Sequence, residues 1–281
     1  MVREVQVSEI TKLVKEHCIK ANKILPCDVE CRMREACKTE KNPLGKEILK
    51  DLVTNFEEAK NIDVPICQDT GMAVVFVELG QDVHLVGGSL NDAIHEGVAQ
   101  GYVEGLLRCS VVSDPIRRVN TNNNTPAIIH VKIVEGDGLK ITVAPKGFGS
   151  ENMSAIAMLK PSQGIEGIED FIVDTARRAG GNPCPPVVLG VGIGGTFELA
   201  ALMAKEQLLR PIGAPSEDPV LAELEQRVKE RINGLGMGPM GIGGRNYCLA
   251  VHAKEHPTHL AGLPVAVNYC CHALRHSETT I

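Results

Sequence analysis

The sequence has little of what nucleic-acid-binding proteins use. It contains no tryptophan, and aromatic residues make up only 3% of its 281 positions, which leaves few rings on which bases could stack. Its 35 acidic and 29 basic residues are mixed along the chain and give a net charge of −6. This balance argues against a polyanionic partner. We therefore expect no nucleic-acid ligand.

Long apolar runs and a targeting segment are also missing. The longest runs, 73–79 and 185–191, fall far short of the roughly 20 residues that span a bilayer. The chain does not open with the basic and apolar pattern of a signal peptide. We expect no membrane association and a cytoplasmic location. In that compartment the ten cysteines are expected to be thiols, metal ligands or core residues rather than disulfides.

Hydrophobic periodicity predicts an α/β fold in which helices surround mixed sheets. Helical spacing recurs in the first 60 residues with a break at 20–26, and again at 90–107, from about 150, at 165–179 and at 218–232. Strands are expected at 73–79, 127–134, 139–144, 185–191, 247–253 and 263–267. The Glu-Gly-Asp-Gly sequence at 135–138 predicts a hairpin between two of them. We expect residues 1–281 to form one compact unit or one with two lobes, and residues 1–60 to cover one side of it.

The stretch "GNPCPPVVLGVGIGGTFELAALMAKEQLL" joins a cysteine to a glycine turn. Residues 190–195 match G-x-G-x-x-G between a strand and a helix, as a dinucleotide site requires. Prolines in 210–219 exclude the second strand that such a site needs, so the glycines better suit a small anion. Gly-Ile-Gly-Gly recurs 49 residues later (242 − 193), and two similar turns are expected to face one site.

Three cysteines lie beside polar residues at the end of apolar segments. Cys184 stands between prolines, Cys67 lies in "VPICQDTGMA", and Cys271 lies in "LPVAVNYCCHALRH". Three thiolates from distant loops could hold a [4Fe–4S] cluster with one open iron. A Cys₃ zinc site is an alternative, and each cysteine singly could be a core residue. The C-x₃-C-x₅-C spacing of Cys27, Cys31 and Cys37 does not match common metal motifs.

Six motifs share one order with a known family. They are "PICQDTG", "DPIRRVNTNNNTPAIIH", "PKGFGSENMS", "NPCPPVVLGVGIGGT", "GLGMGPMGIGG" and "HPTHLAGLPVAVNYCCHALR". Over essentially its whole length the chain resembles the α subunit of the class I iron–sulfur fumarases and the related L-tartrate dehydratases. The sequence departs from the family's pattern at Asn122, Asn123 and Phe148, which puts local loop shape in doubt.

The resemblance implies particular site residues. Cys67, Cys184 and Cys271 would carry the [4Fe–4S] cluster, Cys271 being preferred to Cys270 because it lies twelve residues after His259 (271 − 259). Asp69 and His259 would be catalytic. Gln68 and Arg108 would bind substrate with the backbone N–H of Gly149. The glycines near Cys184 would shape the anion pocket.

The resemblance also implies an activity and a partner. The expected reaction is the reversible hydration of fumarate to (S)-malate, with a β subunit completing the active site in an α₂β₂ heteromer. L-tartrate dehydratase is the alternative within the enzyme class. A non-catalytic protein that stores or senses metal is the alternative from another class.

Overall fold

The computed structural model describes residues 2–281 and divides the chain into two compact units. Unit 1 contains the described residues up to Pro26 together with 56–148 and 275–281, and unit 2 contains 27–55 and 149–274. Each unit is therefore built from separated stretches of sequence. The first 60 residues do not form one part, because their helices are shared between the two units. None of the helices in residues 2–281 combines the length and apolar character needed to cross a membrane.

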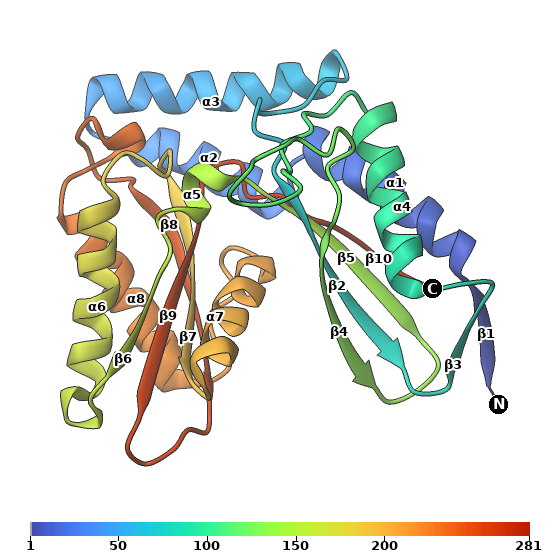
Figure 1. Ribbon diagram of the computed structural model, residues 1–281. Helices are drawn as coiled ribbons and strands as arrows, with labels where there is room; N and C mark the ends of the chain where they lie inside the picture. Colours follow the sequence, from blue (N-terminus) through green and yellow to red (C-terminus); the bar gives the residue numbers. More distant parts are fainter. Residues whose placement is uncertain (1) are drawn as a thin grey trace. The chain divides into compact units, whose positions relative to one another are not determined.

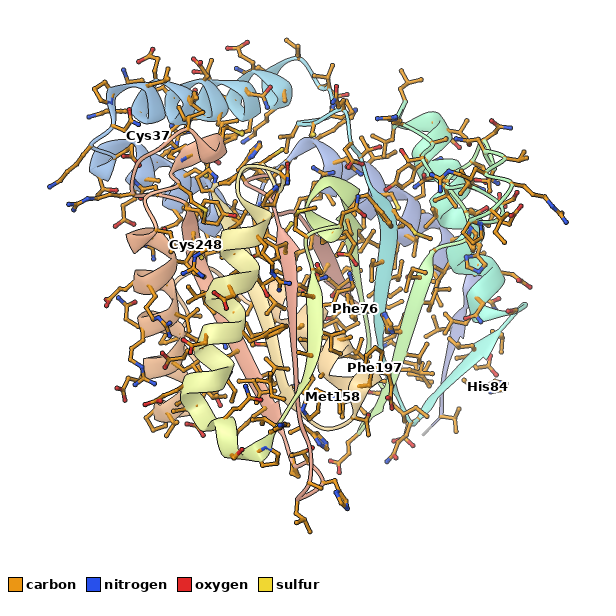
Figure 2. The ribbon with its side chains drawn as sticks, turned by 60° about the vertical axis from the view of Figure 1, so that its left-hand side comes forward. Cys37, Phe76, His84, Met158, Phe197 and Cys248 are labelled. Atoms are coloured by element: carbon orange, nitrogen blue, oxygen red, sulfur yellow. The ribbon has the colours of Figure 1, made fainter. Side chains whose placement is uncertain are left out.

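Unit 1 is a sheet covered by two helices (Figure 1). Its elements are β1 (Arg3–Gln6), α1 (Val7–Lys23), β2 (Met72–Gly80), β3 (Val83–Val86), α4 (Leu90–Glu104), β4 (Ile128–Val134), β5 (Leu139–Lys146) and β10 (Ser277–Thr280). The main sheet has the order β10-β5-β2-β4, and β1 pairs with β3 separately. Ile10, Val14 and Ile94, on the two helices, pack with Val75 and Ile141 of the sheet in one buried cluster. The opposite face carries Phe76 (Figure 2), whose ring stacks on the ring of His130 with the two centroids 5.2 Å apart.

The predicted hairpin between β4 and β5 is wrong. Both strands pair with β2, which lies between them, β4 in parallel and β5 in antiparallel orientation. The loop that joins β4 to β5 passes over the end of β2, where the N–H of Gly80 donates to the carbonyl of Gly138 at 2.8 Å. A Cβ on Gly80 would lie 2.5 Å from the carbonyl oxygen of Gly136. Residues 135–138 therefore form a connection that passes over one strand, although their composition is typical of a tight hairpin turn.

Unit 2 is a sheet with helices on both faces (Figure 1). Its elements are α2 (Cys27–Thr39), β6 (Ala155–Leu159), η1 (Pro161–Gln163), α6 (Gly164–Ala179), β7 (Val187–Gly194), α7 (Phe197–Glu206), η2 (Gln207–Leu209), α8 (Pro219–Gly234), η3 (Pro239–Gly241), β8 (Cys248–His256) and β9 (Leu263–Cys270). Helices α3 (Pro43–Asn61) and α5 (Phe148–Glu151) contain the boundaries between the units. The strand order is β6-β9-β7-β8, with β7 and β8 parallel and the other pairs antiparallel.

Strand β7 is buried along its whole length because helices cover both of its faces. Leu189 and Val191 pack in the cluster that includes Ile172 of α6 and Leu224 of α8. The alternate positions, Gly190 and Gly192, face α7, where added Cβ atoms would lie 1.9 and 2.1 Å from backbone oxygens of the helix. These two glycines are thus required for close packing of helix on strand.

Most predicted elements are confirmed, including the break after Lys23 and the strand-turn-helix of 187–206. The mixed α/β fold surrounded by helices is confirmed as well. The helix expected from about Ser150 is only the single turn of α5, and the strand β6 follows it. Strands β1, β3, β6 and β10 were missed because each is four or five residues long.

Candidate functional site

Residues 67–71, here called the Cys67 turn, lie in unit 1 directly before β2. The Cys67 thiol is partly exposed. The N–H of Asp69 donates to Cys67 Sγ at 3.4 Å. The Asp69 carboxylate closes the turn, because Oδ1 accepts from the N–H of Gly71 at 3.1 Å and Oδ2 from the N–H of Phe148 at 2.9 Å. Gln68, between the thiol and the carboxylate, is exposed.

Thr70 holds Arg108 beside this turn. Its hydroxyl accepts from the N–H of Arg108 at 3.0 Å and donates to the carbonyl of the same residue at 3.1 Å. The Arg108 side chain is exposed, and within the described part of the chain its guanidinium has no ion-pair partner. Unit 1 therefore brings together four of the predicted site residues, Cys67, Gln68, Asp69 and Arg108.

Three buried side chains, none of them predicted from the sequence as a site residue, also bind the backbone of the Cys67 turn. The Tyr102 hydroxyl donates to the carbonyls of Thr70 and Gly71 at 2.9 and 3.1 Å. Asn124, fully buried, donates to the carbonyl of Gly71 at 3.0 Å. The buried guanidinium of Arg275 donates to the carbonyl of Asp69. These residues fix the backbone that presents the Cys67 thiol.

Cys184 and Cys271 are brought together at one end of the unit 2 sheet. Cys184 precedes β7 and Cys271 follows β9, and these two strands run antiparallel, so that Val188 faces Cys270. His272 links the two segments, since its Nδ1 lies 3.0 Å from the carbonyl oxygen of Cys184. A carbonyl can only accept, so Nδ1 carries the proton. Both thiols reach solvent, whereas Cys270 is buried.

The segment that contains Gly149 lies at the same end of unit 2. Asn268, near the end of β9, donates to Glu151 Oε2 and to Ser154 Oγ, both at 2.9 Å. Lys205, near the end of α7, pairs with Glu151 Oε1 at 2.5 Å. Gly149 is exposed, and a Cβ added there would meet none of the surrounding described residues within 4 Å. This polar network orients the Gly149 segment against the strand that leads to Cys271.

His259 and the first glycine turn lie at the other end of the same sheet. His259 is exposed in the loop between β8 and β9, where its Nδ1 accepts from the N–H of Ala261 at 3.2 Å. Gly195 is tied to that end through the carbonyl of His256. Eight residues of β7 separate this end from Cys184, which corresponds to about 26 Å. The prediction that both glycine turns face one site, with the first shaping a pocket at Cys184, is therefore wrong.

The remaining cysteines differ from these three in burial or setting. Burial raises the pKa of the Cys18 and Cys248 thiols to about 12, which disfavours the thiolate that a metal needs. Burial also raises the pKa of Cys109. Cys27 and Cys31 are exposed one turn apart on α2. No disulfide links any of the ten cysteines, all of which lie in the described residues.

Thiols are the side chains that iron–sulfur clusters use, and the three predicted ligands are cysteines. Within residues 2–281 no three His, Cys, Asp or Glu side chains are grouped closely enough to hold a single metal ion. The three predicted ligands are solvent-accessible thiols that follow or precede buried strands. Cys67 Sγ accepts a backbone N–H, and hydrogen bonds of this kind tune Fe–S clusters.

Comparison with known proteins covers nearly the whole chain. The family model described as "Fumarate hydratase (Fumerase)" matches residues 11–280. A Methanocaldococcus jannaschii protein provisionally named as L(+)-tartrate dehydratase subunit alpha is 41% identical over 273 residues, which is 95% of each chain. The L(+)-tartrate dehydratase subunits alpha of Escherichia coli K12 and Shigella sonnei are each 32% identical, over 96% of this chain and 89% of theirs.

Proposed function

Because this chain belongs to the fumarate hydratase family, we propose that it is the α subunit of an iron–sulfur hydro-lyase that reversibly adds water to a small dicarboxylate. The observation that carries the proposal is the pairing of accessible Cys184 and Cys271 through His272, with a third accessible thiol on the Cys67 turn. A fold-stabilising role alone does not require three thiols in such positions.

Cys67, Cys184 and Cys271 are the proposed ligands of a [4Fe–4S] cluster. With three cysteine ligands, such a cluster supplies an open iron that acts as a Lewis acid toward substrate oxygens. The chain's own contribution is to hold the thiols. The N–H of Asp69 would stabilise the Cys67 thiolate, and His272 would fix the backbone of Cys184.

Arg108, Gln68 and Gly149 are the proposed substrate-binding residues. An exposed guanidinium without an ion pair suits bidentate binding of a carboxylate, and Thr70 holds Arg108 at the Cys67 turn. Gln68 adds an exposed amide next to the ligand cysteine. The backbone N–H of Gly149 is a further donor to a substrate oxygen.

Asp69 and His259 are the proposed proton carriers. Each carboxylate oxygen of Asp69 accepts one backbone N–H and keeps a second lone pair for a proton. His259 is proposed on the family resemblance alone, because it lies at the opposite end of β9 from Cys271. Steady-state kinetics of His259→Asn test this role. A kcat reduced by roughly 10²-fold or more supports it, and an unchanged kcat removes His259 from the mechanism.

A β subunit is the proposed partner, in a cytoplasmic α₂β₂ heteromer. The relatives carry the name "subunit alpha" and are matched over most of their length. A name of this kind indicates a second chain. The base that removes the proton next to the leaving hydroxyl is proposed to reside in that chain.

The preferred substrate is proposed to be fumarate, with L-tartrate as the second candidate. The relatives named as L(+)-tartrate dehydratase subunits favour tartrate, whereas the matching family model is described as fumarate hydratase. Turnover of fumarate, mesaconate and L-tartrate by the chain with its β subunit decides between them. The substrate with the highest kcat/KM identifies the activity.

The deciding experiment is anaerobic iron and sulfide analysis with EPR of the purified chain, before and after addition of (S)-malate. About four irons and four sulfides per chain, with a spectrum that malate shifts, support an open cluster. A cluster in which every iron has a protein ligand, as in a protein that stores or senses metal, gives an EPR spectrum that malate does not change. Bound zinc in place of iron contradicts the proposal.

A further inference from the structure

Glu40 is a buried carboxylate in the corner between α2 and α3, only 4% exposed. It binds residues 236–246, here called the glycine loop, more than 190 positions away in sequence. Oε1 accepts from the N–H groups of Lys41 and Asn42, at 2.8 and 2.9 Å. Oε2 accepts from the N–H groups of Arg245 and Asn246 and from the Asn246 side chain, at 3.0, 3.0 and 2.9 Å. One carboxylate thus gathers donors from both segments.

These donors stabilise the negative charge of the Glu40 carboxylate. Burial by itself would raise the pKa of this carboxyl, but the hydrogen bonds from Asn42, Asn246 and Arg245 lower the pKa to about 2. The group is therefore ionised at neutral pH. The surrounding N–H groups need an acceptor at both oxygen positions. A neutral amide of the same size offers an acceptor at only one of them, because its NH₂ group donates.

The glycine loop is packed tightly against Glu40. A Cβ on Gly244 would lie 2.7 Å from Glu40 Oε1. The Asn42 side chain adds a hydrogen bond to the carbonyl of Gly243 at 2.9 Å. The N–H of Gly243 in turn donates to the carbonyl of Met237 at 2.7 Å and closes the loop on itself.

The other side of the glycine loop contacts the segment that presents Cys184. The N–H of Met240 donates to the carbonyl of Pro185 at 2.9 Å. A Cβ on Gly181 would lie 2.8 Å from the carbonyl oxygen of Met240, so the two backbones touch. Within residues 181–185, the N–H of Cys184 donates to the carbonyl of Gly181 at 3.1 Å.

We propose that Glu40 is a positioning residue for Cys184, acting through the glycine loop. Its carboxylate fixes Arg245 and Asn246, and the loop carries this constraint to Met240. Met240 donates to the carbonyl of Pro185 on one side of the thiol and lies close to the backbone of Gly181 on the other. Glu40 touches neither the thiol nor any predicted substrate-binding group, so its effect is indirect. The consequence for an iron–sulfur cluster rests on the proposed function, whereas the effect on the Cys184 backbone does not.

Residue-resolved hydrogen exchange of the full metal-free chain tests the coupling, with Glu40→Gln, Glu40→Ala and the control Glu35→Gln. Glu35 lies on α2, five positions before Glu40 (40 − 35), and its carboxylate pairs with Arg32 at the surface. In both Glu40 variants the amides of Arg245, Asn246 and Cys184 should exchange at least about tenfold faster, since hydrogen bonds to a charged group are lost. Amides of β7 and α8 should keep their protection. Glu35→Gln should change none of these rates.

Two results overturn the proposal. One is faster exchange in the glycine loop while the Cys184 amide keeps its wild-type rate, which would make Glu40 a local anchor only. The other is full protection in Glu40→Gln. If both Glu40 variants fail to fold, Asn246→Ala removes one of the donors to Glu40, together with the side-chain contacts to Ala36 and Thr39. It should accelerate exchange at the same loop and cysteine amides by a smaller factor. An unchanged Cys184 amide in that variant contradicts the coupling.

A spectroscopic readout separates this proposal from the cluster proposal. After anaerobic reconstitution with iron and sulfide, Glu40→Gln should show an altered EPR spectrum and faster iron loss than Glu35→Gln. If the wild-type chain takes up no cluster, the proposed function fails, and hydrogen exchange still decides the role of Glu40. If the cluster forms and the two variants have identical spectra and iron loss, Glu40 does not position the ligand.

Discussion

At the scale of single residues, the properties of the cysteines are decided by where each strand ends. Cys270 is the last residue of β9 and is buried, and Cys271, one position later, is accessible. A shift of one residue in an extended segment turns a side chain to the opposite face. Cys271, which we propose as a cluster ligand on the family resemblance, is thus the more accessible thiol of the two.

His272 gives a prediction at this scale. Replacement of His272 by Ala removes the donor to the Cys184 carbonyl, and the reconstituted chain should lose iron several-fold faster. His272→Asn should largely restore retention, because an asparagine Nδ2 can occupy the place of the Nδ1–H. Anaerobic iron release to a chelator measures both variants. Equal release from the Ala, Asn and wild-type chains would show that this hydrogen bond does not matter.

His252 predicts a pH dependence of stability. Burial, and then the charge of Arg210, lower its pKa from 6.5 to about 4. Between these two pH values the imidazole is therefore neutral in the folded chain and protonated in the unfolded chain. The free energy of unfolding should therefore fall as the pH drops from about 6.5 toward 4, by about 3 kcal/mol from this residue. Urea denaturation of wild type and His252→Asn across this range isolates the contribution. Parallel pH profiles of the two would rule it out.

At the scale of elements, the packing of α7 on β7 depends on glycine. Gly190→Ala places a Cβ 1.9 Å from the carbonyl oxygen of Ala204, so strand and helix must separate. Overpacking of this kind costs about 3 kcal/mol or more where backbone atoms collide. Urea denaturation measures it, with Gly234→Ala as control, since a Cβ added there would meet no other segment of residues 2–281 within 4 Å. Equal stability of the two variants would contradict this account of β7.

The element scale also shows why the hairpin prediction failed. Alternation and turn composition describe β4 and β5 correctly as strands, but they carry no information on which strand lies next to which. Strand β2 enters between them and pairs with both. Seven hydrophobic residues of β2 that suit a buried central strand were visible in sequence, but its position in the sheet was not.

At the scale of the whole molecule, the proposed function predicts dependence on a partner and on anaerobic conditions. The isolated chain should hold its cluster and hydrate fumarate at a negligible rate, and addition of the β subunit should restore turnover. Aeration should abolish that turnover, because an open iron with accessible thiolates admits oxidants. Rate assays before and after exposure to air measure both effects. Substantial hydration by the purified chain alone would contradict the two-subunit proposal.

The sequence by itself determined most of the longer elements and indicated the candidate chemistry, because periodicity, glycine and proline act over a few residues and the cysteine motifs are specific. Tertiary structure alone decided which of these residues meet. It separated the first glycine turn and His259 from Cys184 by the length of β7, and it joined Cys184 to Cys271 through His272. It also brought Glu40 against residues 245 and 246. Such contacts arise from the pairing of distant segments, and no local pattern specifies them.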